Sequence, residues 1–251
     1  MIKFRLIARL DIRNERLIKT ICCEGVRVVG DPAEYARRYD AAGIDEIIYL
    51  DVVASLYGRN GLARLLDKTT SDVFTPITAG GGVRTVDDGM ALLRAGADKI
   101  AVNTAAIRRP ALITELAEKF GSQAVVVQID AKRKGNGWEA YCEGARQATG
   151  RRVSDWCVEV AERGAGELFV TAIDREGVGT GFDTALASHV ARANIPVVIA
   201  GGFNEPKHAI EAAQAGVSGI AIAGALHYSR VSLRDIRQAL SAAGVPVRFA
   251  A

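Results

Sequence analysis

The chain has 251 residues, 49% of them hydrophobic, which is enough to bury one large core. Its 32 basic and 29 acidic residues leave a formal charge of +3, and no long basic run argues for nucleic-acid binding. The N-terminal apolar run is short and is interrupted by Arg5 and Arg9, so we expect neither a signal peptide nor a membrane span there.

The cysteines and histidines argue against a metal site or a disulfide framework. Cys22, Cys23, Cys142 and Cys157 show no Cys-X-X-Cys spacing, and the adjacent pair is poorly placed for a disulfide. The three histidines are scattered at positions 189, 208 and 227, so no zinc cluster is predicted. We expect a reduced, cytoplasmic protein of enzyme size that needs no metal and contacts no membrane.

Apolar runs alternate with segments of helical periodicity along the whole chain. The runs predict strands at 4–10, 46–50, 75–79, 99–102, 124–129, 168–172, 196–200 and 219–223. The segments predict helices at 31–43, 59–69, 85–95, 109–119, 152–163, 183–192, 205–215 and 232–242. Continuously apolar runs indicate parallel strands buried on both faces. Eight such units predict a single (β/α)8 TIM barrel over residues 1–251, with a doubly wound open sheet as the alternative.

The chain also repeats itself. Glu46, within AGIDEIIYLD, aligns with Glu167, within GAGELFVTAID, 121 residues later. The same offset aligns the Ala-Gly-Gly at 79–81 with that at 200–202. We therefore expect two homologous half-barrels, approximately 1–121 and 122–251, with no linker between them.

Two aspartates each end a strongly apolar strand. Asp11 closes LIARLD and Asp130 closes AVVVQID, and the repeat places them across the barrel mouth, where this fold carries its chemistry. Two carboxylates that face one ligand can act as general acid and base if their environments separate their pKa values. A helix cap, or an ion pair with Lys19 or Lys132, is the alternative. Asp51, which ends the second strand, either positions substrate or caps its own loop.

A glycine-rich turn follows the third predicted strand. Gly80 to Gly82 come directly after an apolar run, and Asn103 and Thr104 end the next strand. Glycines let backbone N–H groups approach an anion closely, and the two polar side chains add donors. The pattern predicts a phosphate site, although three glycines alone also fit an ordinary turn.

A second, weaker phosphate site is predicted in the other half of the chain. Phe203 stands where the first site has Gly82, and Gly224-Ala225 replace the Asn-Thr pair. Glu176, Gly177 and Gly202 are the candidates that remain there.

The longest predicted loops, 14–30 and 131–151, follow the first and fifth strands. Long loops above opposite catalytic strands suit a lid and a substrate cradle. At the other ends of the strands lie four charged residues, two basic and two acidic: Arg5, Glu46, Lys99 and Glu167. They are either solvated charges or a polar gate around the barrel axis.

Together these features resemble the cyclase (synthase) subunit of imidazole glycerol phosphate synthase. The resemblance spans the chain through LDIRNERLIK, GDPAEYA, GIDEIIYLDVVAS, AGGGVR, GADKIAVNTAA, FGSQAVVVQIDAKR, GAGELFVTAIDREG and GFD, in family order. It implies a two-fold symmetric barrel without cofactor, in a heterodimer with a glutaminase docked on its bottom (N-terminal) face. Ammonia would pass through the barrel and convert a phosphoribulosyl formimino carboxamide ribotide to imidazole glycerol phosphate and an aminoimidazole carboxamide ribotide, a step of histidine biosynthesis.

The resemblance also implies individual roles. It makes Asp11 and Asp130 the catalytic pair, Lys19 a flexible substrate-loop lysine and Asp98 a partner-docking position. It assigns one phosphate site to Gly82, Asn103 and Thr104. It assigns the gate of the ammonia channel to Arg5, Glu46, Lys99 and Glu167.

Several positions depart from the family pattern. Arg9 stands where cysteine is usual, pointing towards the barrel interior, and Thr20 replaces a glycine after Lys19. DREGVGT replaces DRDGTK, and Phe203 replaces a glycine. The serine expected after the eighth strand is missing, since ALHYS begins with alanine. All three departures lie at the second phosphate site.

These departures also resemble paralogues associated with sugar amidation in surface-polysaccharide pathways. Two interpretations stay open: a cyclase, favoured by Asp11, Asp130 and Lys19, and an ammonia-delivering subunit with altered or lost cyclase chemistry, favoured by the altered second phosphate site. A non-catalytic scaffold, the third, would leave the aspartate pair without a purpose.

Overall fold

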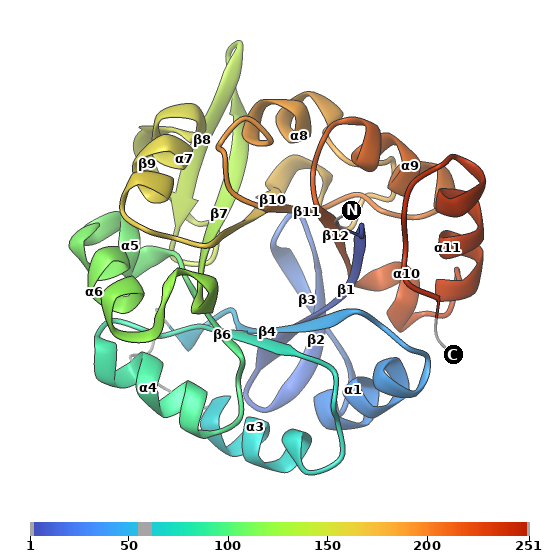
Figure 1. Ribbon diagram of the computed structural model, residues 1–251, viewed down its shortest axis with the longest axis horizontal. Coiled ribbons are helices and arrows are strands. Elements are labelled where there is room, and N and C mark those ends of the chain that lie inside the picture. Colours follow the sequence, from blue (N-terminus) through green and yellow to red (C-terminus); the bar gives the residue numbers. More distant parts are fainter. Residues whose placement is uncertain (1–2, 55–61, 250–251) are drawn as a thin grey trace.

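Eight parallel strands close into a barrel with helices around the outside (Figure 1). The computed structural model describes residues 3–54 and 62–249. The strand order is β10-β11-β12-β1-β4-β5-β6-β7, and β7 pairs back with β10. The barrel strands are β1 (Arg5–Arg13), β4 (Glu46–Asp51), β5 (Ile77–Gly80), β6 (Lys99–Val102), β7 (Val125–Lys134), β10 (Glu167–Ala172), β11 (Val197–Ala200) and β12 (Gly219–Ile222). The predicted (β/α)8 barrel is confirmed. The alternative, an open sheet, is wrong, because an open sheet has two unpaired edge strands, whereas β7 and β10 pair here and close the barrel.

The outer helices agree with the sequence periodicity. They are α1 (Pro32–Ala41), α3 (Leu62–Thr70), α4 (Val86–Arg94), α6 (Ala111–Phe120), α7 (Val153–Glu162), α8 (Thr184–Val190), α9 (Pro206–Gln214) and α11 (Leu233–Ala242). Side chains of Asp31, Thr85, Asp183 and Ser232 accept hydrogen bonds from N–H groups of the helices that they precede, which fixes where those helices begin. Positions 59–61 of one predicted helix lie outside the described residues. No helix in the described ranges is long and apolar enough to cross a membrane.

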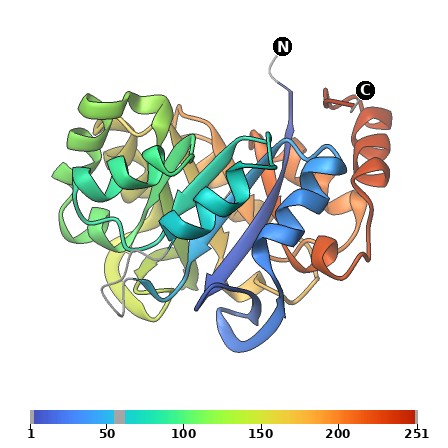
Figure 2. The same cartoon turned by 90° about the horizontal axis from the view of Figure 1, so that it is seen from below.

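Shorter elements appear where the sequence predicted loops. β2 (Arg16–Ile21) and β3 (Glu24–Gly30) form a hairpin on β1, and β8 (Gly137–Cys142) and β9 (Gln147–Arg152) form one on β7. Figure 2 shows the β2–β3 hairpin at the end of the barrel opposite the N-terminus. Segment 14–30 is therefore ordered sheet rather than a loop, because RLIKTI and EGVRVVG continue the antiparallel pairing. The short helices α5 (Thr104–Arg108) and α10 (Gly224–His227) follow β6 and β12, and 3-10 turns cover Ser122–Ala124 and Ile173–Arg175.

The two hairpins extend the symmetry of the sequence. Each follows the first strand of a predicted half, β1 in one and β7 in the other. Two half-barrels of common origin stay a prediction, supported by this matching placement.

The barrel interior is layered, because every second residue of a strand faces the axis. A compact apolar cluster fills the middle of the interior and is separate from the larger core between strands and helices. Its members include Ile7, Ile48, Val126 and Phe169, all at most 3% exposed. On β1 this alternation places Arg5 below the cluster, Ile7 within it, and Arg9 and Asp11 above it.

A buried hydrogen bond fastens α10 to α1. The hydroxyl of Tyr39 lies 2.6 Å from Nδ1 of His227, and burial lowers the pKa of His227 to about 3, so the ring is neutral at physiological pH. Tyr39→Phe leaves Nδ1 without this partner, and the free energy of unfolding should fall by about 1–2 kcal/mol in urea titrations. Tyr35→Phe is the matched control, since Tyr35 contacts His227 only through the ring edge. Equal losses in both variants would contradict this account of the bond.

Candidate functional site

Asp11 and Asp130 line one cavity at the carboxyl ends of β1 and β7. Both side chains are at most 3% exposed. Asn103 and Gln128 line the same cavity. The structure thus brings together the two carboxylates that the sequence predicted to face each other, at the end of the barrel where this fold carries its active sites.

The two carboxylates have different surroundings. Asp11 accepts a 2.8 Å hydrogen bond from Nε of Arg9, and the pair is buried. Asp130 accepts hydrogen bonds from Asn103 Nδ2 at 2.9 Å and from Gln128 Nε2 at 3.0 Å. Burial raises the pKa of Asp130 above its ordinary value. One carboxylate is therefore paired with a cation, while the other is held mainly by neutral amides, the arrangement that acid–base chemistry at a single site requires.

A second cavity at the mouth contains the weaker predicted phosphate site. Lys19, Glu176, Gly177, Gly202 and Phe203 all line it. Phe203 also packs against other rings, with its centroid 6.0 Å from that of Phe182. Its side chain therefore both borders the cavity and belongs to the packing behind it.

Lys19 is held in place rather than free. It lies on β2, is buried, and forms an ion pair with Glu176. Its Nζ also donates a 2.6 Å hydrogen bond to the carbonyl oxygen of Thr20. The backbone N–H of Cys22 donates to the carbonyl oxygen of Glu176 at 2.8 Å, which fastens the β2–β3 hairpin over the mouth. Strand pairing and the ion pair both restrain Lys19 in this structure, and its role as a mobile substrate-loop lysine stays a prediction.

The structure brings together the three residues of the first predicted phosphate site, and phosphate binding there stays a prediction. Gly82, Asn103 and Thr104 line one cavity between the ends of β5 and β6. Gly82 has φ +76°, a conformation that favours glycine. Oγ1 of Thr104 accepts a 3.0 Å hydrogen bond from the N–H of Glu143, in the turn between β8 and β9. The second hairpin therefore contacts this site directly.

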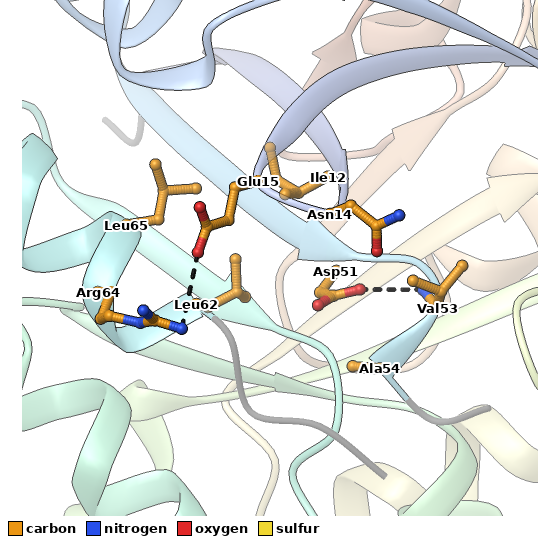
Figure 3. Close-up of a pocket in the computed structure, with 9 residues that line it drawn as sticks. All are labelled: Ile12, Asn14, Glu15, Asp51, Val53, Ala54, Leu62, Arg64 and Leu65. Atoms are coloured by element: carbon orange, nitrogen blue, oxygen red, sulfur yellow. Dashed lines mark hydrogen bonds and ion pairs between the residues drawn. The ribbon is translucent and has the colours of Figure 1, made fainter. Parts of the chain in front are cut away.

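Asp51 ends β4 beside a further pocket (Figure 3). Its Oδ1 accepts a 3.0 Å hydrogen bond from the N–H of Val53. Asp51 therefore caps its own loop, which was one of the two roles expected for it. Glu15 and Arg64, whose charged atoms lie 3.8 Å apart, form an ion pair on the other side of the pocket, which Figure 3 marks with a dashed line. Asp51 also borders the cavity that Asp11 and Asp130 line, and its contact with substrate stays a prediction.

At the opposite end of the barrel the four charged residues form a closed ring. Arg5 pairs with Glu46 at 2.6 Å and also with Glu167. Nζ of Lys99 lies 3.1 Å from Glu46 and 2.9 Å from Glu167. Burial opposes the charge of Arg5, but its bonds to Glu167 and Glu46 outweigh burial and raise its pKa. Beside the ring, Asp98 is exposed and accepts a 2.8 Å hydrogen bond from the N–H of Ile77.

Two residues of the site were not predicted from the sequence. Gln128 donates to Asp130, and Arg9 donates to Asp11. Each lies two residues before its aspartate on the same strand, and residues i and i+2 of a strand face the same side. That spacing was the available signal. Within residues 3–54 and 62–249, no three His, Cys, Asp or Glu side chains are grouped as metal ligands would be.

The geometry agrees with comparisons to known proteins. A family described as "Histidine biosynthesis protein" matches residues 5–232. Imidazole glycerol phosphate synthase subunit HisF of Gluconacetobacter diazotrophicus is 47% identical over 99% of this chain and 97% of its own length. HisF of Legionella pneumophila is 52% identical over 82% of this chain and 98% of its own length. HisF of Pyrococcus furiosus is 41% identical over 99% of this chain and all of its own length.

The chain belongs to this family. Family membership agrees with the resemblance found in the sequence, and the match covers both predicted halves, including every residue of the two mouth cavities and of the charged ring.

The raised pKa of Asp130 has a consequence for stability. A carboxyl whose pKa is higher in the folded than in the unfolded state makes folding less favourable as pH rises above its unfolded value. We expect Asp130→Asn to be more resistant to urea than the original chain at pH 7, with the gap closing as pH falls towards 4. Asp67→Asn, an exposed change on α3, is the control and should show no such trend. A pH-independent difference for Asp130→Asn would contradict the assignment.

Proposed function

We propose that this protein is the cyclase subunit of imidazole glycerol phosphate synthase and acts in histidine biosynthesis. Its substrate is a phosphoribulosyl formimino carboxamide ribotide, and its products are imidazole glycerol phosphate and an aminoimidazole carboxamide ribotide. The observation that carries the proposal is the pair of buried carboxylates, Asp11 and Asp130, which share a cavity in unequal surroundings.

The acid–base roles follow from those surroundings. Addition of ammonia to a carbonyl carbon requires a base that removes a proton from nitrogen and an acid that protonates the departing oxygen. Asp130, whose pKa is raised by burial, retains a proton more readily and serves as the acid. Asp11, paired with Arg9, serves as the base.

Binding of the substrate uses the two cavities beside the carboxylates. Gly82, Asn103 and Thr104 bind one phosphate group. The cavity with Lys19, Glu176, Gly177 and Gly202 receives the other end of the substrate, and Asp51 borders the space between. Because Lys19 pairs with Glu176, its ammonium must exchange a carboxylate for the ligand, which makes binding at this end the weaker of the two.

Ammonia reaches the carboxylates from a glutaminase subunit docked on the bottom face of the barrel, where the exposed carboxylate of Asp98 is available. The ring of Arg5, Glu46, Lys99 and Glu167 lies on the axis between that face and the apolar interior. Lys99 is the movable member, since it is a single point charge on a flexible stem, whereas the guanidinium of Arg5 is planar and forked. The complex works in the cytoplasm, where glutamine is available.

The sugar-amidation alternative is not favoured, because relatives 41–52% identical to this chain carry the name HisF. The departures at the second phosphate site, Phe203 among them, are compatible with a working cavity there.

Replacing either carboxylate tests the catalytic assignment. Asp11→Asn or Asp130→Asn should reduce ammonia-dependent ring closure by at least about a hundredfold, because each removes a proton-transfer group. Turnover is followed as formation of both products, with Asp67→Asn as the control. Undiminished turnover in either variant would rule out the cyclase assignment.

The gate is tested by comparing two nitrogen sources. In Lys99→Ala, glutamine-dependent turnover with a glutaminase should change relative to the original chain, whereas turnover with added ammonium should stay within about twofold, because ammonia enters from the open mouth. Lys68→Ala, an exposed lysine on α3, is the matched control. If both rates in Lys99→Ala move by the same factor, the ring has no gating role.

A further inference from the structure

Arg9 is a buried cation inside the barrel. It lies on β1 between Ile7 of the apolar interior and Asp11 of the catalytic cavity, and its side chain is 5% exposed. Its guanidinium lies 5.6 Å from the centroid of the Phe169 ring, on the opposite side of the barrel. A charge in such a position is stable only when opposite charges and acceptors surround it.

The contacts of Arg9 cross the barrel. Nε donates to Asp11 at 2.8 Å, and NH1 donates to Oγ1 of Thr171 on β10 at 3.1 Å. NH1 also lies 3.9 Å from Oε2 of Glu176, which holds Lys19. One guanidinium therefore joins a catalytic carboxylate, the far wall of the barrel and the carboxylate that holds the hairpin lysine.

Arg9 also borders both of the cavities at the mouth. It lines the catalytic cavity with Asp11 and Asp130, and it lines the cavity with Lys19 and Glu176. A residue in this position can fix one carboxylate and change the field at the other without contacting the substrate's reacting atoms.

We propose that Arg9 is a positioning residue for the catalytic pair. It holds the Asp11 carboxylate in one orientation through Nε while Thr171 holds the guanidinium, and its charge acts across the cavity on Asp130. The proposal rests on the proposed cyclase function for its kinetic part only.

The charges that face the pair come from several elements. Arg9 and Asp11 are on β1, Lys19 is on β2, Asp130 is on β7, and Glu176 follows β10. The partly buried thiol of Cys23, between β2 and β3, also faces them, and burial raises its pKa. Burial raises the pKa of Asp130, and the positive charge of Arg9 opposes that rise. We therefore expect removal of this charge to raise the pKa of Asp130 further.

Two substitutions separate charge from geometry. Arg9→Met keeps length but loses the charge, and Arg9→Lys keeps the charge but cannot reach Asp11 and Thr171 with a planar fork. Arg16→Gln, exposed on β2, is the matched control. Circular dichroism and urea unfolding establish which variants fold.

The kinetic readout is ammonia-dependent turnover with the ribotide, without a partner. Arg9→Met should lower kcat about tenfold or more while KM changes less than about threefold, and its pH–rate profile should move to higher pH. Arg9→Lys should lower kcat less and leave the profile in place. An unchanged kcat and profile in folded Arg9→Met, or a loss confined to KM, would overturn the proposal.

A second readout does not depend on activity. Carbon-13 NMR titration of the aspartate carboxyls reports the pKa of Asp130 directly in each folded protein. A higher pKa in Arg9→Met than in the original chain and in Arg9→Lys supports the proposal even if the ribotide is not the substrate. The same pKa in all three would overturn it. If Arg9→Met does not fold, the uncharged Arg9→Gln takes its place, with the same two outcomes.

Discussion

Charge pairing inside a closed barrel is the constraint on which the rest of this structure depends. Eight parallel strands place every second side chain around one axis that is shielded from solvent, so each charge there needs an opposite partner. Arg5 and Lys99 share Glu46 and Glu167 at one end. Towards the other end of the barrel, Arg9 forms ion pairs with Asp11 and Glu176. The apolar layer between them separates the two networks.

This separation divides the work of the proposed cyclase. The lower network is neutral overall and lies on the proposed path from the bottom face, whereas the upper network surrounds Asp11 and Asp130, the proposed acid–base pair. Between them the interior is apolar, which suits the passage of neutral ammonia and not of ammonium. Within the upper network the two carboxylates differ, because Asp11 is paired with Arg9, whereas Asp130 is held mainly by the amides of Asn103 and Gln128 and burial raises its pKa.

Much of the fold and of the site could be predicted from the sequence. Continuous apolar runs predicted all eight barrel strands, and the repeat predicted that Asp11 and Asp130 would meet. The ring of Arg5, Glu46, Lys99 and Glu167 followed from their positions where strands begin.

The remainder depended on contacts between distant segments. The β2–β3 hairpin was predicted as a loop, because a short strand such as RLIKTI gains stability only by pairing with β1. Lys19 was predicted to lie in a flexible loop, because no local sequence pattern indicates its ion pair with Glu176, which lies 157 residues away. Arg9 was noted only as a departure. Its contact with Asp11 follows from i, i+2 spacing, but that with Thr171 requires the closed barrel.

The most direct measurement is ammonia-dependent turnover of the purified chain with the ribotide, at high ammonium and alkaline pH and without a glutaminase. The account predicts that imidazole glycerol phosphate and the aminoimidazole carboxamide ribotide form in equal amounts, because one ring closure releases both. A folded chain that still activates a glutaminase but forms neither product would contradict it, and would make the barrel an ammonia conduit for a different acceptor.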